Sequence, residues 1–282
     1  MEFSYFSRNG KLLPIEEADI SLSNIEYQYG FGVYETIRVS KRIPYFLSDH
    51  IERLLESARI IGLAHAFSAD SVARASVELI EKNGADTCNI KLLLIGGPST
   101  GLRAGKVQGA TLNILCFNPL FPEKKLYRDG VKTITVRHER DFPHAKTLNM
   151  LGSYLAYQKA RSLNAYDALL VDRAGNIVEG TRTNFFCIRD RTLFSPPEEK
   201  ILLGVTRKAV LKTAEQNGFR FEQQDINYTD ISAYDGAFLT STSSNILPIR
   251  SIDSTELGET PATLRELVAA FDHFIDRCKG EM

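Results

Sequence analysis

The sequence predicts a two-domain α+β protein, because strand and helix patterns both occur along a chain long enough for two domains. Asn9-Gly10 between two apolar runs is a strong hairpin signal. Ser48 or Asp49 can cap a helix whose apolar residues follow at helical spacing. The chain of 282 residues suits one large domain or two smaller ones.

A short stretch near the middle of the chain is the best candidate for a linker. Residues 118–125 contain Pro119 and Pro122 followed by a charge cluster, and proline disfavours the continuation of a helix or a central strand. We therefore predict a small N-terminal α/β domain over residues 1–118, a linker over 119–127 and a larger C-terminal domain over 128–282.

The remaining elements are predicted from hydrophobic periodicity and turn residues. Strands are expected at residues 3–6, 12–15, 33–39, 90–95, 111–117, 131–136, 167–172, 177–180, 183–188, 192–195 and 236–240. Helices are expected at residues 48–58, 69–82, 146–160, 204–218 and 263–277. The third helix would contain Lys146, with Leu148, Leu151 and Leu155 as its apolar positions. A tight glycine loop is expected at residues 27–32.

Composition excludes several classes of protein. The chain is 43% hydrophobic and 24% charged with a net charge of −1, so nothing in its charge favours nucleic acid or an anionic membrane. No apolar run approaches the ~18 residues of a membrane span, and the N-terminus does not resemble a signal peptide. The four cysteines form no CxxC pair, so no metal site is expected and Cys116 and Cys187 are predicted to be buried thiols. A reducing cytoplasm is the expected location.

The stretch from His144 to Gly152 contains the most informative lysine. Lys146 follows Pro143 where the apolar spacing becomes helical. A lysine attacks a carbonyl only when it is neutral, and its usual pKa of about 10.4 must be lowered for that. Lys146 is therefore either an ordinary surface cation or a lysine that forms a Schiff base.

Two further stretches suit a bound anion. Gly204-Val205-Thr206 begins a predicted helix, where amide groups and the helix dipole favour a phosphate. Residues 241–244 follow a strand and read Ser-Thr-Ser-Ser, which adds hydroxyl donors. Arg53 lies close to the apolar face of its helix. Either its aliphatic side-chain carbons cover apolar surface, or its guanidinium binds the phosphate together with the other two stretches. Hydroxyls at a helix start can equally be simple caps.

Two charged residues in predicted strands complete the candidate set. Glu179 ends an apolar strand and is either a solvated carboxylate or the partner of a protonated ring nitrogen. Lys91 interrupts the buried strand at 90–95, so it requires a partner, a water-filled site or a path to solvent. A neutral lysine, a phosphate cradle and a carboxylate for a pyridinium are what pyridoxal 5′-phosphate requires.

Six segments in order along the chain resemble the class IV aminotransferase family, the fold-type IV pyridoxal phosphate enzymes. That family includes D-amino-acid aminotransferases, branched-chain aminotransferases and aminodeoxychorismate lyase. The similar segments are Tyr29-Gly30-Phe31-Gly32-Val33-Tyr34-Glu35, His50-Ile51-Glu52-Arg53-Leu54, Ala145-Lys146-Thr147-Leu148-Asn149, Glu179-Gly180-Thr181-Arg182-Thr183-Asn184-Phe185, Gly204-Val205-Thr206-Arg207 and Thr240-Ser241-Thr242-Ser243-Ser244.

The resemblance implies a role for each of these stretches. Lys146 would carry the cofactor and move the proton, and Glu179 would pair with the pyridine nitrogen. The phosphate would be held by Arg53, Val205, Thr206, Ser241 and Thr242. The implied fold has a small N-terminal α+β domain and a larger C-terminal domain with a β-barrel-like core. The active site would lie between the domains and be completed by a loop of the second subunit of a homodimer.

Residues typical of different branches of the family occur together in this chain. Leu148-Asn149-Met150-Leu151 resembles the D-amino-acid and lyase branches, and Tyr34 matches a tyrosine that contacts the substrate carboxylate in D-amino-acid aminotransferases. That branch also uses an Arg-x-His pair, but here Arg103 is followed by Ala104 and Gly105. Lys91 falls where the lyases have a lysine and branched-chain enzymes an arginine.

Three activities therefore remain open, and Tyr34, Lys91, Arg103 and Ser243 are the expected substrate contacts. The first activity is an aminotransferase for small amino acids and 2-oxo acids, of the D-amino-acid type. The second is aminodeoxychorismate lyase, which forms 4-aminobenzoate and pyruvate, and a further alternative is a branched-chain aminotransferase. A non-enzymatic relative that binds the cofactor is the alternative from another class.

Overall fold

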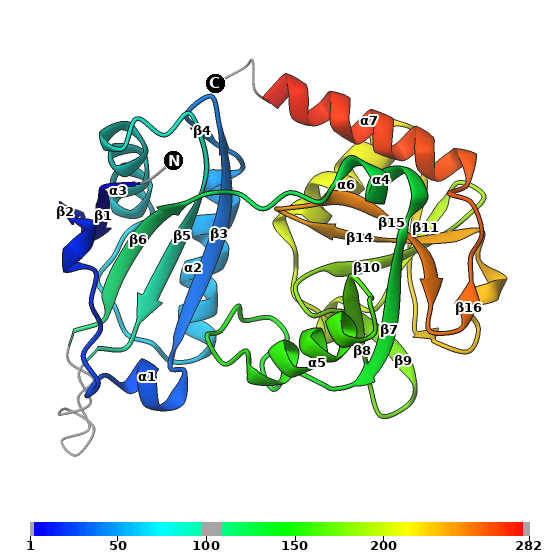
Figure 1. Cartoon of the computed structure of the whole chain (residues 1–282), viewed down its shortest axis with the longest axis horizontal. Helices are drawn as coiled ribbons and strands as arrows, with labels where there is room; N and C mark the ends of the chain where they lie inside the picture. Colours follow the sequence, from blue (N-terminus) through cyan, green and yellow to red (C-terminus); the bar gives the residue numbers. More distant parts are fainter. Residues whose placement is uncertain (1–2, 98–108, 279–282) are drawn as a thin grey trace. The chain divides into compact units, whose positions relative to one another are not determined.

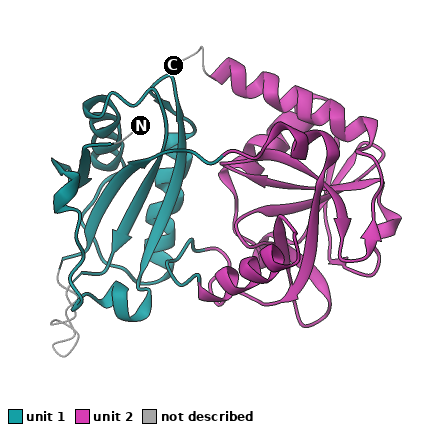
Figure 2. Ribbon diagram, in the orientation of Figure 1, with its two compact units in different colours: residues 1–120, 145–150, 282 teal, residues 121–144, 151–281 magenta. Residues whose placement is uncertain are grey.

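The computed structural model of the chain describes residues 3–97 and 109–278 (Figure 1). The chain divides into two compact units (Figure 2). The first unit comprises Met1–Leu120 and Ala145–Met150, and the second comprises Phe121–His144 and Leu151–Glu281. The predicted linker over 119–127 includes the start of helix α4 (Lys124–Asp129).

The first unit is built on a six-stranded antiparallel sheet in the order β2-β1-β6-β5-β3-β4. Its strands are β1 (Tyr5–Arg8), β2 (Lys11–Pro14), β3 (Gly32–Ser40), β4 (Ile43–Pro44), β5 (Thr87–Ile95) and β6 (Thr111–Phe117). Asn9 and Gly10 have φ values of 55° and 82°, the left-handed pair that a tight hairpin turn requires. The predicted N-terminal hairpin is therefore confirmed.

Helices α2 (Leu47–Ile60) and α3 (Ala69–Lys82) pack on one face of this sheet (Figure 1). Ile37 and Ile90 from the sheet and Leu54 and Leu79 from the helices meet in one buried core. The residues of β3 alternate between this core and the opposite face, as the sequence pattern predicts.

Residues 27–32 differ from the expected loop, because helix α1 (Ile25–Tyr29) occupies the first half of them. The Ile25 N–H donates to Gly97 O at 3.0 Å, and the Gly97 N–H donates to Glu26 Oε2 at 3.0 Å. These bonds join residues about 70 positions apart in the chain, so local sequence does not reveal them. Gly30 ends the helix with a φ of 66°.

Lys146 does not lie in a helix, so that prediction is wrong. The Tyr34 N–H donates to Lys146 O at 2.9 Å, and the Leu148 N–H donates to Gly32 O at 2.9 Å. Thr147 forms an isolated antiparallel bridge with Val33. These bonds hold residues 146–148 beside β3, and helix α5 (Leu151–Ser162) begins only after them.

The second unit contains a β-barrel. The strands of this unit, six of which form the barrel, are β7 (Val131–Arg137), β8 (Asp167–Val171), β9 (Asn176–Gly180), β10 (Asn184–Arg189), β11 (Thr192–Ser195), β12 (Arg220–Gln223), β13 (Ile226–Asn227), β14 (Gly236–Ser241), β15 (Asn245–Ile252) and β16 (Thr255–Glu256). The order β10-β14-β15-β7-β8-β9 closes on itself where Asn184 of β10 pairs with Glu179 of β9. The pairs β15–β7 and β7–β8 are parallel and the others in the ring are antiparallel. The predicted α+β fold with a barrel-like C-terminal core is confirmed.

Helices cover the barrel of the second unit (Figure 1). Helices α6 (Val205–Gln216) and α7 (Ala262–Cys278) pack together and against β14 and β15, respectively, while α5 packs on β7 and β8. Strand β8 is buried along its whole length, because its side chains alternate between the barrel interior and the core under α5.

The buried face of α5 differs from the predicted one. Leu151 and Leu155 are 66% and 54% exposed, whereas the buried positions are Ser153, Ala156 and Ala160. Small residues occupy the buried face because the helix lies close to β8. Among the described residues, no helix is both long and apolar enough to cross a bilayer. All four cysteines, each within the described ranges, are free, and Cys116 and Cys187 are buried as predicted.

Candidate active site

The Lys146 side chain lies over an aromatic ring of the first unit. Its Nζ is 4.7 Å from the centre of the Tyr34 ring. The Lys146 N–H donates to Ser57 Oγ of α2 at 3.1 Å, and its carbonyl accepts from the Tyr34 N–H. The backbone of Lys146 is therefore held on both sides while the side chain extends over Tyr34.

Glycine at position 32 makes this close approach possible. A Cβ added to Gly32 would lie 2.8 Å from Leu148 Cδ1 and 3.0 Å from Leu94 O. A side chain there would require the Leu148 side chain to move and would press against the Leu94 carbonyl. The absence of a side chain at Gly32 thus allows the segment that contains Lys146 to lie close to β3.

Arg53 is fixed by a carboxylate that the sequence interpretation did not single out. Arg53 Nε and Nη2 donate to the two oxygens of Glu35 at 2.6 and 2.8 Å. His50 Nδ1 lies 2.7 Å from Glu35 Oε2. The Glu35 side chain is fully buried and that of Arg53 is 13% exposed, so the guanidinium is locked in one orientation.

The electrostatics of this triad follow from burial and from two cations. Burial raises the pKa of the Glu35 carboxyl, but Arg53 and His50 together outweigh it and lower that pKa to about 2. Burial lowers the pKa of His50, and Glu35 partly opposes this, whereas Arg53 and Lys146 lower the pKa further. The triad and Lys146 thus share one electrostatic environment.

Lys91 lies near the same tyrosine. Its Nζ is 5.2 Å from the centre of the Tyr34 ring. Thr36 pairs with Lys91 across β3 and β5, so Lys91 and Tyr34 are on the sheet face opposite the helices. The Tyr34 ring thus gives the Lys91 ammonium a cation–π partner, which a charge within an apolar strand requires.

Glu179 is the central carboxylate of the second unit. It is 5% exposed. Arg140 Nε donates to Glu179 Oε1 at 2.6 Å, and the Leu202 N–H donates to Oε2 at 3.3 Å. Glu179 is therefore a buried, oriented carboxylate rather than a solvated one at a strand end.

Asn184 brings the other predicted residues of this unit near Glu179. In the barrel it pairs with Glu179 on one side and with Thr240 on the other. Its Nδ2 donates to Leu202 O at 2.7 Å, and a Cβ added to Gly204 would lie 2.0 Å from its Oδ1. The strand end before Ser241 and the start of α6 therefore meet around one asparagine.

The two predicted anion-binding stretches both contain polar groups that could face a ligand. Gly204 is the N-cap of α6 and brings no capping side chain of its own, so the amides of Val205 and Thr206 begin a helix at its positive end. In the neighbouring loop, Ser241 Oγ lies 2.7 Å from Ser244 Oγ and accepts from the Ser244 N–H at 3.1 Å. Thr242 and Ser243 are half-buried at the tip of this turn.

A second buried carboxylate supports the turn after Glu179. Asp167 Oδ1 accepts from Thr181 Oγ1 at 2.5 Å, and Oδ2 accepts from Thr183 Oγ1 at 3.1 Å. Burial raises the pKa of Asp167, and hydrogen bonds from the threonines oppose the shift. A Cβ added to Gly180 would lie 2.0 Å from Thr183 Oγ1, so the turn depends on this glycine.

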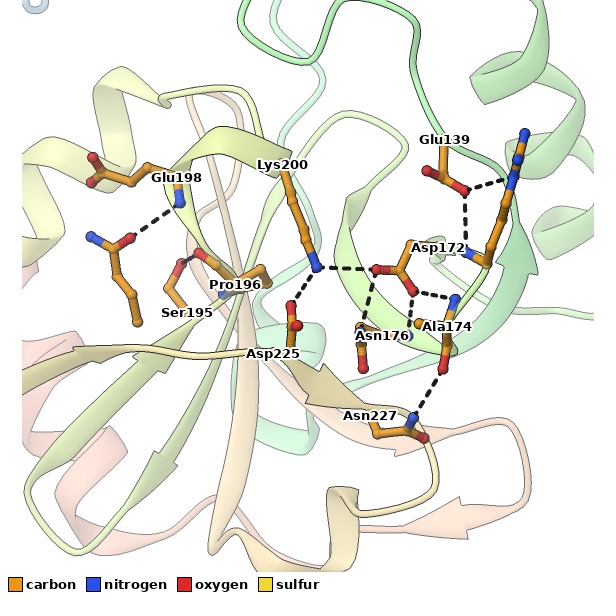
Figure 3. A network of polar contacts seen from close by, with 12 residues as sticks. Glu139, Asp172, Ala174, Asn176, Ser195, Pro196, Glu198, Lys200, Asp225 and Asn227 are labelled. Carbon is orange, nitrogen blue, oxygen red and sulfur yellow. Dashed lines mark hydrogen bonds and ion pairs between the residues drawn. The ribbon is translucent and has the colours of Figure 1, made fainter.

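The segment between β11 and α6 is tied to the barrel by a polar network (Figure 3). Lys200 Nζ donates to Asp225 Oδ1 at 2.6 Å and to Asp172 Oδ2 at 3.3 Å. Two residues after Lys200, the Leu202 N–H contacts Glu179. Two residues before it, Glu198 pairs with Arg207 of α6 at 3.0 Å. The network thus holds a segment that contacts both the Glu179 site and the start of α6.

The predicted residues form two groups, one in each unit. The first unit contains Tyr34, Arg53, Lys91 and Lys146, and the second contains Glu179, Val205, Thr206, Ser241, Thr242 and Ser243. Arg103 lies outside the described residues. Sequence reasoning missed Glu35, Ser57, Arg140 and Asn184. A signal exists for Glu35, which falls on the apolar side of the alternation in β3.

Comparison with known sequences shows which proteins share this architecture. The family described as "Amino-transferase class IV" matches residues 32–252. The chain is 30% identical over 253 residues to D-alanine aminotransferase of Bacillus licheniformis, with 89% of each chain covered. It is 26% identical over 278 residues to a branched-chain-amino-acid aminotransferase of Pseudomonas aeruginosa, covering 94% of this chain and 91% of that one.

Solved structures agree with the sequence comparisons. A branched-chain aminotransferase from the archaeon Thermoproteus uzoniensis, solved with norvaline, superposes with a TM-score of 0.86 at 30% identity, covering 95% of this chain and 94% of that one. A putative 4-amino-4-deoxychorismate lyase from Legionella pneumophila gives a TM-score of 0.80 at 25% identity, covering 92% and 97%.

The fold and the sequence matches together define the class of protein. The chain belongs to the class IV aminotransferase family. Members of this family bind pyridoxal 5′-phosphate, and similar structures contain pyridoxamine 5′-phosphate or N-(5′-phosphopyridoxyl)-L-glutamate.

Proposed function

We propose that this chain transfers an amino group between an amino acid and a 2-oxo acid, with D-amino acids as its preferred donors. The observation that carries the proposal is the placement of Lys146 Nζ over the Tyr34 ring, with Lys91 Nζ near the same ring. The similarity to D-alanine aminotransferase of Bacillus licheniformis supports the choice of D-amino acids.

The residues present fit pyridoxal 5′-phosphate. A phosphate is doubly negative, and the start of α6 offers amides at the positive end of a 12-residue helix next to a serine-rich turn. The buried carboxylate of Glu179 suits a protonated ring nitrogen, and Arg53 supplies a fixed cation. We propose that Val205, Thr206, Ser241, Thr242 and Arg53 hold the phosphate.

Each proposed catalytic role rests on one side chain of this chain. When bound, pyridoxal phosphate supplies an electron-accepting ring that stabilises negative charge at the substrate α-carbon. Lys146 Nζ would attach the cofactor and would remove the proton from that α-carbon. Glu179 would keep the ring nitrogen protonated. Tyr34 and Lys91 would orient the substrate, with Lys91 Nζ binding a carboxylate.

A second function is aminodeoxychorismate lyase. The presence of a lysine at position 91 favours it, as does the similarity to the putative lyase from Legionella pneumophila. In that case Lys91 would again bind a substrate carboxylate, and Lys146 would again move the proton. The two functions differ in whether the amino group stays with the enzyme or leaves in the product.

Single-substrate reactions distinguish the candidates. The loaded enzyme would be mixed with D-alanine, L-leucine or aminodeoxychorismate in separate reactions, and the visible absorbance of the cofactor would be followed. Loss of that absorbance with D-alanine and release of pyruvate is the expected result. Conversion only with L-leucine would identify a branched-chain enzyme instead. 4-Aminobenzoate formation without conversion of any amino acid would identify the lyase and reject transamination.

We further propose that the chain works as a homodimer, as the resemblance to the family implies. Light scattering coupled to size-exclusion chromatography tests this, because a mass near that of one 31.6 kDa chain would contradict it.

A further inference from the structure

Arg140 connects Glu179 to the chain that leads to Lys146. Arg140 Nε donates to Glu179 Oε1 at 2.6 Å, and Arg140 Nη2 donates to Pro143 O at 2.5 Å. Pro143 stands three residues before Lys146 in the sequence. Two nitrogens of one rigid guanidinium therefore hold a carboxylate and a backbone carbonyl at the same time.

The ion pair between these residues is largely removed from water. The side chains of Arg140 and Glu179 are 15% and 7% exposed. A carboxylate in such a place requires a counter-charge and hydrogen bonds, or it loses its charge. Arg140 supplies the charge, and the Leu202 N–H supplies a bond to the second oxygen.

Neighbouring strands fix the backbone of Glu179, whereas contacts such as that with Arg140 orient its side chain. Glu179 pairs with Leu170 of β8 and with Asn184 of β10, so neighbouring strands fix its main chain on both sides. Gly180 follows at once, and its N–H donates to Thr183 O at 2.9 Å. The orientation of the carboxylate then depends on the donors that reach it.

We propose that Arg140 is a positioning residue that keeps the Glu179 carboxylate ionised and directed at the ring nitrogen of the cofactor. This inference rests on the proposed function, since it requires the proposed contact between Glu179 and that nitrogen. Arg140 acts through Glu179 and does not itself touch the ring. Its contribution to cofactor binding therefore depends on the presence of a nitrogen in the ring.

This dependence separates the proposed role from a general structural one. An arginine that merely braced residues 138–144 would affect any ligand of the same shape. An arginine that acts through Glu179 affects only ligands that Glu179 recognises. Pyridoxal 5′-phosphate and its 1-deaza analogue, in which CH replaces the ring nitrogen, have the same shape and differ in this one atom.

The experiment measures the dissociation constants of both compounds for the cofactor-stripped, full-length chain. We expect Arg140→Met to bind pyridoxal phosphate at least about 10-fold more weakly than the unaltered chain, the usual size for losing a charge-assisted hydrogen bond. We expect the deaza analogue to lose less than about 3-fold. Arg140→Lys keeps the positive charge but loses the fixed pair of guanidinium donors. It should therefore bind pyridoxal phosphate more tightly than Arg140→Met does, with no such gain for the deaza analogue.

Two further variants complete the test. Arg128→Met removes an exposed arginine that pairs with its sequence neighbour Asp129 and should leave both constants unchanged. In Glu179→Gln, adding Arg140→Met should cause little further loss of affinity, because the partner through which Arg140 acts is already altered. This comparison holds even if Arg140→Met lowers the melting temperature.

The outcomes separate the two proposals. Equal losses for both compounds in Arg140→Met, or fully additive losses in the double variant, would overturn the positioning role alone. No binding of pyridoxal phosphate by the unaltered chain would overturn the proposed function and this inference together.

Discussion

Glu35 and Arg53 form a two-pronged ion pair whose carboxylate is fully buried, with nitrogen–oxygen distances of 2.6 and 2.8 Å. The pair joins β3 to α2 through the core side of the sheet. It also fixes the guanidinium that we propose as a phosphate ligand, so its loss should affect both stability and cofactor binding.

Glu35→Gln removes the charge and leaves Arg53 buried without its counter-ion. Breaking a buried pair in this way lowers the free energy of unfolding by about 3–5 kcal/mol. Urea unfolding followed by circular dichroism measures the change. Glu56→Gln is the matched control, because Arg59 and Glu56 form a similar two-pronged pair with side chains that are 74% and 49% exposed. An equal effect of the two substitutions would contradict the assigned role of burial.

Acid should weaken the fold through the same pair. The pKa of Glu35 is about 2 in the folded chain against 4.5 for a free carboxyl. A lowered folded pKa gives stability that is complete above about pH 4.5 and is lost as pH falls toward 2, about 3 kcal/mol in total. The lowered pKa of His50 acts in the same direction, beginning below its free value of 6.5.

The measurement is urea unfolding from neutral pH down to about pH 3 for the unaltered chain and for Glu35→Gln. The difference in unfolding free energy between them should shrink as the pH falls. A difference that stays constant over this range would show that Glu35 does not carry the effect.

Lys146→Ala should abolish attachment of the cofactor and its visible absorbance while leaving the fold intact. The contacts that hold this segment use the backbone of Lys146, namely its N–H to Ser57 and its carbonyl to Tyr34. Borohydride reduction followed by peptide mass spectrometry locates the modified lysine, and Lys159→Ala on exposed α5 surface is the control. A modified peptide that lacks residue 146 would reject the assignment.

Lys91→Met should raise KM for the carboxylate substrate by about 10-fold, with the cofactor content unchanged, because one charge-assisted contact to substrate is lost. Lys82→Met provides a matched control in the same unit, since Lys82 Nζ lies 4.6 Å from the centre of the Tyr5 ring. Steady-state kinetics and cofactor absorbance give both readouts. An unchanged KM would assign Lys91 to packing against Tyr34 alone.

Lys200→Met should loosen the segment shown in Figure 3. The ammonium bridges Asp225 and Asp172, but the Lys200 side chain is 33% exposed, so the loss of stability should be only roughly 1 kcal/mol. Faster amide exchange at residues 198–203 is the local signature, measured against Lys132→Met on β7. Unchanged exchange at Leu202 would show that this bridge does not hold the segment.

Local signals predicted most elements of the fold. The Asn9-Gly10 turn, the helix start at Gly204 and the alternation of β3 depend on neighbouring residues and could be recognised from sequence. The predicted cap at Ser48 or Asp49 is wrong, because α2 begins at Leu47 and Phe46 is its N-cap. The non-helical conformation of residues 145–150 could not, because hydrogen bonds to Gly32 and Tyr34 hold this segment beside β3. The face of α5 was misjudged for a related reason: contact with β8 selects small residues over leucines.

The candidate site also has residues that local sequence reveals and residues that only distant contacts reveal. Glu179 and Thr206 lie near the ends of β9 and α6, and Lys146 lies outside any helix. Their residue types and sequence neighbours make all three recognisable candidates, and their roles stay predictions. Their partners are distant in sequence: Arg140 is 39 residues from Glu179, and Ser57 is 89 residues from Lys146. Sequence alone offers no way to pair them, although a carboxylate on the apolar side of β3 could have drawn attention to Glu35.

The placement of residues 145–150 makes the first unit discontinuous in sequence. A fragment ending at Leu120 would lack the strand-like partner that satisfies the Tyr34 amide and the Gly32 carbonyl at the edge of β3. An exposed, unpaired strand edge promotes association between chains. Such a fragment should therefore be prone to aggregate, and a synthetic peptide spanning residues 143–152 should restore its solubility by complementation.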